Sequence, residues 1–396
     1  MAGETPSSRD EAFPWHLGVY DAHCHPTDSV SSIDSIAAMK TRALAIMATR
    51  DQDQSIVADF ADQLDISRDS LPMLNPAEFS ETRGHLIPSF GWHPWFSHQI
   101  YDDAPNAKME SVNKTEHYNR VITPAPGQDH AFITSLPNPR PLSGLISQTR
   151  SYLARYPFAM VGEIGLDRAF RIPGMKMLDS AYQRDTALTP GGREGRRLSP
   201  YRVHMDHQRT ILIAQLNLAG DMQRAVSVHG VAAHGVLFET LQETWHGHEK
   251  SVLSKREMKK KFNINTADKG MDLPEECSVD SGNPKPFPPR ICLHSYSGSP
   301  DTLRRYLNLS IPTVIFFSFS RLVNFSVPTS KKAIDVIKAV PDDRILAESD
   351  FHTAGEQMDD LLEDIVRAIS EIKGWSLEDG VKQLAANWMS YIFGPA

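Results

Sequence analysis

Short apolar runs alternate with amphipathic stretches along most of this chain. The run at 42–49 (RALAIMAT) is almost wholly apolar, which is typical of a strand buried on both faces, whereas Ile211, Ala214 and Leu218 share one stripe at helical spacing. Runs of the first kind predict strands at 17–25, 42–49, 86–92, 158–164, 225–229, 290–294, 313–318 and 344–349. Helices are predicted at 29–40, where Ser29 is the expected cap, and at 54–64, 146–155, 202–219, 237–245, 300–307, 330–339, 356–372 and 376–393.

This order gives about eight strand-then-helix units with no hairpin signal between them. Alternating strands and helices predict a parallel sheet, and eight units predict a closed TIM-type (β/α)8 barrel. A doubly wound open sheet is the alternative, and it is disfavoured because no glycine-rich loop follows the first strand. We expect a flexible N-terminus at 1–14 and one domain over 15–396, interrupted by three loop insertions rich in Pro, Asn, Asp or charge at about 100–142, 172–200 and 247–288.

Composition narrows the class of protein. The net charge of −8 gives no general attraction to nucleic acid, so a phosphate ligand would need a local site. Three cysteines make no disulfide framework and fit a reducing compartment. The first fourteen residues do not resemble a signal peptide, and no apolar run is long enough to span a bilayer. We therefore expect a soluble protein of the cytoplasm, the nucleus or both, without a membrane partner. The cysteines are Cys24, Cys277 and Cys292.

The first predicted strand carries two histidines near its end. His23 and His25 are two residues apart, so their side chains point to the same face of the strand, and Pro26 ends it. Two imidazoles on one face can supply two corners of a metal site. Taken alone, the same pattern also fits a polar strand end with two solvated or hydrogen-bonded histidines.

Acids and histidines recur at the carboxyl ends of the other predicted strands. In a barrel these ends converge on one mouth, where a chance scatter of polar residues would not place them. Four imidazoles and two carboxylates converging there could hold two metal ions, with one carboxylate bridging them. Ligands of this softness favour Zn or Mn over Mg, although the metal stays open among these three. The residues are His23, His25, His93, Glu163, His229, His294 and Asp350.

Six short motifs give these residues a more specific context. DAHCHP, GWHPW, GEIGLD, SVHG, LHSYSGS and ILAESD occur in this order along the chain. This pattern resembles the TatD-type metal-dependent deoxyribonucleases of the amidohydrolase superfamily, and it covers nearly the whole chain outside the N-terminus and the insertions. The long insertions resemble those of a fungal branch named for interaction with a subunit of the cell-division ubiquitin-ligase machinery.

The resemblance implies a role for each position that matches. His23, His25 and Asp350 match the ligands of one metal, His229 and His294 match those of a second, and Glu163 matches the bridging carboxylate. Family members cleave phosphodiester bonds in DNA, commonly from an end. In that chemistry Asp350 could also accept a proton from the attacking water. His93 and Trp95 match the segment that lines the substrate mouth.

The chain departs from the family pattern after three of its motifs. His229 is followed by GVAAH where the family usually has a small residue, an arginine and an acid, so phosphate binding could be weaker unless His234 substitutes. GLD is followed by RAFR rather than an aromatic residue first. Asp350 is followed by Phe351 and His352, and His352 is either a substrate-binding residue at the mouth or a surface-loop histidine.

Several other features have both a functional and a purely structural interpretation. The run 255–261 (KREMKKK) could bind DNA or direct nuclear import, but it also fits a solvated charged loop. Trp92 and Trp95 could stack on a base, although at least one should pack in the core. Cys24 should be buried and should not bind metal. His204 and His207 are expected on a helix surface, and His246 and His248 in an insertion without partners.

Three functions follow from these observations. The first is a metal-dependent phosphodiesterase acting on DNA ends, with Asp350 and Glu163 as its catalytic residues. The second is hydrolysis of an amide, a lactone or another phosphoester, because the leaving group cannot be deduced from sequence. The third is a scaffold of the same fold whose insertions bind a helical-repeat protein, with weak or altered hydrolase activity.

Overall fold

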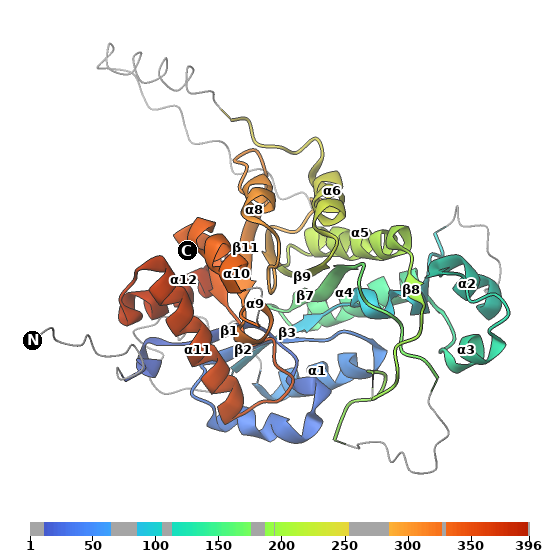
Figure 1. Ribbon diagram of the computed structural model, residues 1–396, viewed down its shortest axis with the longest axis horizontal. Helices are drawn as coiled ribbons and strands as arrows, with labels where there is room; N and C mark the ends of the chain where they lie inside the picture. The colour runs from blue at the N-terminus through green and yellow to red at the C-terminus, as the bar shows by residue number, and fades with distance from the viewer. Residues whose placement is uncertain are drawn as a thin grey trace, which may run out of the picture.

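Eight parallel strands form the centre of the protein. The computed structural model describes residues 12–64, 85–104, 113–175, 187–193, 195–252, 285–326 and 330–394. The strands follow one another around the sheet in chain order, each hydrogen-bonded to the next (Figure 1). They are β1 (Tyr20–Cys24), β2 (Ala43–Met47), β3 (His85–Phe90), β7 (Met160–Asp167), β9 (Val226–Val231), β10 (Arg290–Leu293), β11 (Val314–Phe319) and β12 (Ile345–Ala347).

The first and last strands meet and make the sheet a nearly closed barrel. The backbone N–H of Asp350 donates to the carbonyl of His23 at 3.0 Å, and that of Ser349 donates to the Asp21 carboxylate at 3.0 Å. Because consecutive strands are neighbours throughout and the two edges meet, the chain has no point at which the strand order reverses. The predicted (β/α)8 barrel is confirmed, and the open doubly wound sheet is wrong.

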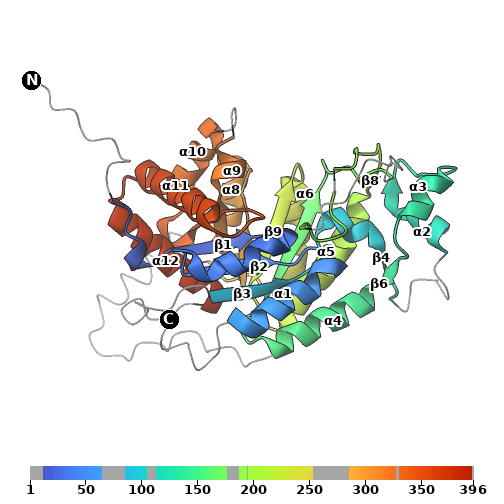
Figure 2. The same ribbon diagram turned by 90° about the horizontal axis from the view of Figure 1, so that it is seen from below.

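Helices cover the outside of the barrel and one of its ends (Figures 1 and 2). The last helix, α12, closes the amino-terminal end of the strands, where Trp388 stacks on Tyr20 with ring centroids 4.5 Å apart and Tyr391 donates to the Val226 carbonyl at 3.0 Å. The opposite, carboxyl end stays open for polar groups. The longer helices are α1 (Asp51–Leu64), α4 (Leu142–Arg155), α5 (Met205–Asp221), α6 (His234–Trp245), α8 (Pro300–Tyr306), α10 (Ser330–Ala339), α11 (Glu356–Lys373) and α12 (Leu377–Phe393).

Two predicted helices differ from the structure. The segment Val30–Ala38 is a 3₁₀ helix, and the side chain of Ser29 makes no capping bond. The Ser32 hydroxyl binds the Ser29 carbonyl and accepts from the Ala354 amide, so this serine serves local and tertiary bonds in place of a regular α-helix. The helix predicted at 202–219 begins only at Met205, because Arg202–Val203 is extended and pairs as β8 with β5 (Ile122–Thr123).

The first insertion is not simply a loop. It contains α2 (Lys114–Val121), α3 (His130–Ser135) and the short strands β4 (Ile100–Tyr101), β5 and β6 (Arg140–Pro141). Apolar side chains of these helices form a small core of their own, which also receives Ile172 and Val203 from the second insertion and its exit. The frequent Pro, Asn and Asp residues, most of which lie in the connections between the short elements, led to the prediction of a loop without a core.

Several predictions fall partly or wholly outside the described residues. These are the N-terminus at 1–11, residues 105–112 of the first insertion, 176–186 and 194 of the second, most of the third insertion, the basic run 255–261 and Cys277. Among the residues that are described, no helix is long and apolar enough to cross a membrane. Cys24 and Cys292 are buried free thiols, as expected for Cys24.

Candidate metal-binding active site

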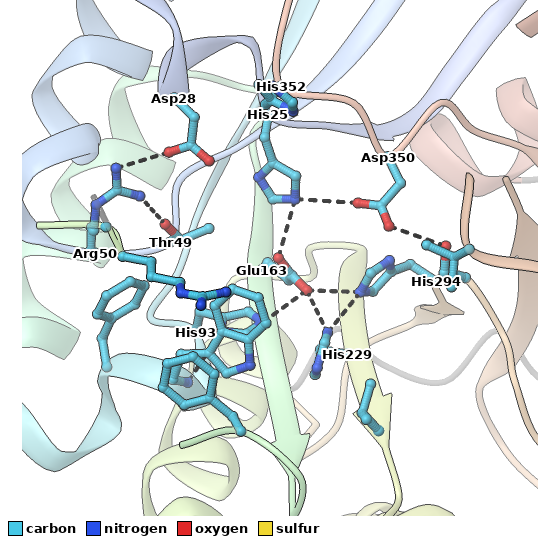
Figure 3. A pocket seen from close by; sticks show the side chains of 18 of the residues that line it. His25, Asp28, Thr49, Arg50, His93, Glu163, His229, His294, Asp350 and His352 are labelled. Atoms are coloured by element: carbon cyan, nitrogen blue, oxygen red, sulfur yellow. Dashed lines mark hydrogen bonds and ion pairs between the residues drawn. The ribbon is translucent and has the colours of Figure 1, made fainter. Parts of the chain in front are cut away.

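The seven polar residues singled out in the sequence all lie at the carboxyl end of the barrel. Six of them face one another in Figure 3, and the seventh, His23, contacts Glu163. Four of them follow their strands as expected, and His23 is the last residue but one of β1. Glu163 and His229 do not, because β7 continues to Asp167 and β9 to Val231. The pairing of β7 with β9 shifts register between Val161 and Ile164, and Glu163 lies within this irregular stretch. The carboxylate therefore enters the mouth from inside a strand.

Glu163 is the centre of the site. Its carboxylate is buried and lies close to five imidazoles, which come from four other strands or strand ends. The convergence required of a metal site is therefore present in the structure. The distances from the Glu163 carboxylate are 2.7 Å to His294 Nε2, 2.9 Å to His229 Nδ1, 3.1 Å to His93 Nε2, 3.4 Å to His25 Nε2 and 3.6 Å to His23 Nε2.

The charges of this cluster depend on one another. Burial opposes ionisation of Glu163, but the nearby His93 and His294 rings and hydrogen bonds from His229 and His23 hold its pKa well below the usual value. Burial likewise opposes protonation of His294, yet the Glu163 carboxylate raises its pKa well above 6.5. The Glu163 carboxylate and the His294 imidazole therefore stabilise each other's charged form.

One group of candidate ligands lies where the barrel closes. His23, His25 and Asp350 place three ligand atoms within 4.8 Å of one another. The Asp350 Oδ1 atom is 3.6 Å from His25 Nε2 and 3.9 Å from His23 Nε2. Asp350 has a left-handed backbone (φ 50°), which aspartate tolerates better than most residues, and this turn directs its carboxylate into the mouth. Burial raises the pKa of Asp350 to about 6.

A serine hydroxyl fixes the orientation of His23. Ser227 Oγ lies 2.7 Å from His23 Nδ1, on the side of the ring away from the other ligands. When this nitrogen donates its proton to Ser227, Nε2 keeps the lone pair that a cation needs. Burial lowers the pKa of His23 to about 3, which also favours the neutral ring.

The second group surrounds the other oxygen of Glu163. His229 Nδ1 and His294 Nε2 are 3.2 Å apart, and both contact Glu163 Oε1. On its far side, His229 Nε2 lies 3.2 Å from Asp167 Oδ2. Metal-binding histidines commonly donate their second nitrogen to a carboxylate in this way. The geometry therefore leaves His229 Nδ1 as the atom available to a cation.

Asp167 was not identified as a site residue from the sequence. It lies at the true end of β7 and accepts hydrogen bonds from His229 and, at 2.7 Å, from the Trp95 indole. Although burial opposes its ionisation, these two hydrogen bonds and the charge of His229 lower its pKa to about 2. Asp167 lies four residues after Glu163 in the motif GEIGLD, so both side chains are expected on one face of the strand. Its partners Trp95 and His229 are distant in the sequence, so its role could not be deduced there.

His93, Glu163 and His229 form a further group of possible cation ligands, but the hydrogen bonds of His93 favour a donor role. The backbone N–H of Trp95 donates to His93 Nδ1 at 3.1 Å, so this nitrogen is unprotonated and Nε2 carries the proton. That Nε2–H points at Glu163 Oε1, 3.1 Å away. Burial lowers the pKa of His93 to about 4, so the ring is neutral and acts as a hydrogen-bond donor to the carboxylate.

Glu348 is a second buried carboxylate that sequence reasoning missed. Its Oε1 accepts from the amide and the hydroxyl of Ser295 at 2.7 and 2.6 Å, whereas Oε2 is a buried atom without a hydrogen-bond partner. It forms a further possible cation group with His23 and His294. Its position two residues before Asp350 in an extended segment was a usable signal, because alternate residues share a face.

The polar cluster forms the floor of a cavity of about 720 Å³. His352 and Trp95 line it as expected at the mouth, while Trp92 is buried in the core. Apolar and basic residues of the second insertion complete one wall, and Arg50 lies beside it, bound to Asp28 and Asp53 at 2.8 and 3.0 Å (Figure 3).

Four histidines outside the cluster have different surroundings. His204 is exposed, as predicted, whereas His207 is half-buried, and its Nε2 donates to the Ser97 carbonyl at 3.0 Å. His207 is less exposed than a helix-surface position suggests, because His117 of the first insertion lies over it, with ring centroids 6.1 Å apart. His234 lies beside the mouth, with Nε2 3.3 Å from the Ser297 hydroxyl. His246 is 3.7 Å from the carboxylate of Glu249, so it has a partner after all.

Comparison with known proteins places the chain in a family. The model of the family described as TatD related DNase matches residues 20–392. The chain is 37% identical over 376 residues to the Cut9-interacting protein scn1 of Schizosaccharomyces pombe, covering 94% of this chain and 98% of that protein. It is 27% identical over 277 residues to an uncharacterized deoxyribonuclease of Saccharomyces cerevisiae, covering 69% and 68% of the two chains.

Solved structures agree on the fold. A TatD-family hydrolase from Entamoeba histolytica matches with a TM-score of 0.51 at 11% identity, covering 96% of this chain and 99% of that one. The TatD homologue YJJV of Escherichia coli matches with a TM-score of 0.50 at 15% identity, covering 96% and 100%. Given the family match over nearly its whole length and the extended identity to scn1, this chain belongs to the TatD-related DNase family of metal-dependent hydrolases.

Proposed function

We propose that this protein is a metal-dependent phosphodiesterase that cleaves DNA from an end and uses two divalent cations. The observation that carries the proposal is the position of Glu163, whose two carboxylate oxygens face two separate sets of imidazoles. A carboxylate with this environment can bridge two cations. His23, His25 and Asp350 supply the remaining ligands of one, and His229 and His294 those of the other.

The donor set fits such cations in two respects. Several candidate ligand atoms lie close together, such as the Nε2 atoms of His23 and His25 at 3.0 Å, and each can donate a lone pair to a cation. The outer nitrogens of His23 and His229 are already held by Ser227 and Asp167. Mixed nitrogen and carboxylate ligands favour Zn or Mn, and Mg remains an alternative.

A pair of bound cations would neutralise the phosphate and lower the pKa of an attacking water. The protein's own groups supply the rest of the chemistry. Asp350 lies at the cavity floor with a pKa raised to about 6, so it can accept a proton near neutral pH and release it again. His93 keeps the Glu163 carboxylate in place through its Nε2–H. Trp95 and His352 line the space that the substrate would enter.

Metal analysis combined with a nuclease assay tests this function. The purified protein should retain divalent metal and degrade DNA, and a chelator should abolish the cleavage. Glu163→Gln and His25→Ala should lose metal and reduce kcat by more than roughly 100-fold, because even outer partners of metal ligands contribute about 10- to 100-fold. His204→Ala is the matched control, since this exposed histidine makes no capping bond.

Circular dichroism must show that the variants keep the barrel. If folded Glu163→Gln protein cuts DNA as fast as the wild type, the assigned site is wrong. If the metal-loaded wild type hydrolyses an amide or a lactone but no phosphodiester, the substrate class is wrong while the metal site stands.

A second candidate function is binding of a protein partner. It is favoured by the relative named as a Cut9-interacting protein, which resembles this chain over almost its entire length. A protein partner would need a binding surface that the hydrolase reaction does not use, and the insertions are the segments proposed to provide it. Both functions can coexist, because the insertions and the metal cluster use different residues.

The third insertion provides the test of this second function. A deletion of 253–284 is preferable to a longer one, because Lys250 donates to the Ser310 carbonyl and Phe287 is part of the core. Binding to a purified helical-repeat partner should be lost in the deletion variant, while its metal content should equal that of the wild type. Unchanged partner binding would contradict this interface.

A further inference from the structure

The seam between β1 and β12 differs from the other joins of the barrel. Seven pairs of neighbouring strands, from β1 with β2 to β11 with β12, are joined by parallel ladders. Among the residues that the structure describes, no such ladder joins β1 to β12, and β12 already ends at Ala347. The last join of the barrel must therefore be held by bonds of another kind.

The Asp21 carboxylate supplies several of these bonds. Its Oδ1 atom accepts from the backbone amides of His23 and Ser349, both at 3.0 Å, and its Oδ2 atom accepts from the Ser349 hydroxyl at 2.5 Å. The same hydroxyl accepts from the Phe351 amide at 3.2 Å. Asp21 is fully buried, so these bonds to a carboxylate are little weakened by water. One side chain on β1 thus holds the segment that follows β12.

Two backbone hydrogen bonds continue the seam towards the mouth. The Asp350 amide donates to the His23 carbonyl at 3.0 Å, and the His25 amide donates to the Phe351 carbonyl at 2.8 Å. Three candidate ligands of one cation therefore lie on opposite sides of the seam, His23 and His25 on one side and Asp350 on the other. Asp350 Oδ1 faces His25 Nε2 across it at 3.6 Å (Figure 3). This spacing depends on how firmly the seam is closed.

The remaining candidate ligands do not depend on this seam. Glu163 and His229 lie on β7 and β9, which pair directly with each other. His294 follows β10, which has its own ladder with β9, and its amide donates to the Val228 carbonyl at 3.1 Å. Loosening the seam should therefore disturb the ligands of one cation and spare those of the other.

We propose that Asp21 is a positioning residue for one of the two cations: its carboxylate holds the barrel seam closed and thereby sets the spacing between His25 and Asp350. This inference rests on the proposed function, because it assumes two cations. Asp21 does not coordinate a cation itself, since three donors already occupy its two oxygens. It acts through the ligands on either side of the seam.

Calorimetric titration of the metal-free, full-length protein with Mn²⁺ tests this role. The wild type should bind two ions. Asp21→Ala should weaken one of the two sites about 10- to 100-fold, the range found for outer partners of metal ligands, and leave the other site unchanged. In a His25→Ala background, which already lacks a ligand of the same site, Asp21→Ala should not weaken the remaining site further.

Two milder variants keep the proposal testable if Asp21→Ala does not fold. Asp21→Asn should lie close to the wild type, because the amide oxygen can still accept from the two backbone amides. Ser349→Ala removes only the hydroxyl bond and should weaken the same site by a smaller factor than Asp21→Ala. Wild-type Mn²⁺ affinities in both Asp21→Ala and Ser349→Ala would overturn the proposal.

Asp359→Ala is the matched control. Asp359 on α11 is also buried, and its carboxylate likewise accepts from two backbone amides and one hydroxyl, those of Lys40 and Thr41 at 2.7, 3.0 and 2.6 Å. This variant should lose a similar free energy of unfolding in urea but bind two Mn²⁺ ions with the wild-type affinities. An equal loss of Mn²⁺ affinity in Asp359→Ala and Asp21→Ala would show a merely structural effect and overturn the proposal.

Hydrogen exchange of the metal-free protein examines the seam directly. In Asp21→Ala, peptides covering 20–26 and 347–353 should exchange roughly tenfold faster, because the bonds of the His25 and Asp350 amides open locally. Peptides of β7 and β9 should keep the wild-type rate, and the control variant should not accelerate the seam peptides. Equal acceleration of all peptides would contradict a local role of Asp21.

The outcomes separate this inference from the proposed function. Two bound Mn²⁺ ions in the wild type, with no selective loss in Asp21→Ala, overturn the role of Asp21 alone. The predicted selective loss in a protein that hydrolyses no phosphodiester overturns the proposed function alone. A wild type that binds a single ion overturns both.

Discussion

Asp167 illustrates how one residue can set the chemistry of its neighbours without facing the cavity floor. Its carboxylate accepts the Nε2 proton of His229 and the indole proton of Trp95, at 3.2 and 2.7 Å. The first bond selects which nitrogen of His229 faces Glu163, and the second fixes the Trp95 ring at the cavity wall. A single ionised side chain thus connects the proposed metal site with an aromatic ring that lines the cavity.

Asp167→Asn should weaken metal binding about 10- to 100-fold, because the neutral amide is a poorer acceptor for the His229 proton. The shape of the side chain is preserved, so the melting temperature of the metal-free protein should change little. Competition with a fluorescent chelator measures the affinity. Asp343→Asn is the control, since that carboxylate is 69% exposed and pairs only with the adjacent Arg344 in the described ion pairs. Equal affinities of Asp167→Asn and wild type would contradict this role.

At the scale of elements, the close approach of β7 to β9 places Glu163 and His229 beside each other. Gly165 lies opposite His229 in this pairing and has a φ of 150°, which L side chains rarely adopt. A β-carbon at Gly165 would lie 2.1 Å from the His229 carbonyl oxygen. Only glycine allows the two strands to keep this separation.

Gly165→Ala should destabilise the protein by about 2 to 4 kcal/mol, from overpacking and from backbone strain. It should also weaken metal binding, because β9 and His229 must move away from Glu163. Urea unfolding measures the first effect. Gly235→Ala is the opposite case: no atom lies within 4 Å of the added carbon on α6, so stability should rise by about 0.5 to 1 kcal/mol. A neutral Gly165→Ala would show that the strands can separate freely.

At the scale of the whole molecule, histidine side chains connect the first insertion and α5 to the segment 94–99 that follows β3. His117 on α2 donates to the His98 carbonyl at 2.7 Å, and His207 on α5 donates to the Ser97 carbonyl at 3.0 Å. Burial lowers the pKa of His98 to about 3 and that of His207 to about 4, and it lowers the pKa of His117 as well. These rings are neutral in the folded protein at pH values where the unfolded chain protonates them.

Acid should therefore destabilise the protein through this group. The histidines contribute their full stability above the unfolded pKa of 6.5, and this contribution falls as the pH decreases from 6.5 towards 4, since the unfolded state then binds more protons. The free energy of unfolding of the wild type should fall between about pH 7 and about pH 5. In His207→Gln this fall should be smaller by roughly 1 to 2 kcal/mol. Urea titrations at both pH values measure it. His246→Gln should leave the loss unchanged, because that ring is 87% exposed.

The order of the strands and the positions of most candidate ligands could be deduced from the sequence. Alternation of apolar runs with helical stripes is a local property, and eight such units without a glycine-rich loop after the first strand predict a closed barrel more strongly than an open sheet. For the same reason the residues after each run, from His23 to Asp350, were expected at one mouth. The TatD-type motifs added expected roles to positions that the pattern had already selected.

Contacts between distant segments could be decided only by the tertiary structure. Ser227 on β9 orients His23 on β1, Asp167 orients His229, and Glu348 and Ser295 meet beneath His294; no local pattern indicates these pairings. The small core of the first insertion and the attachment of the second to Arg50 are of the same kind. Local sequence determines where a strand ends and which residues follow it. Which side chain on another strand then receives its proton depends on how the closed barrel brings the strands together.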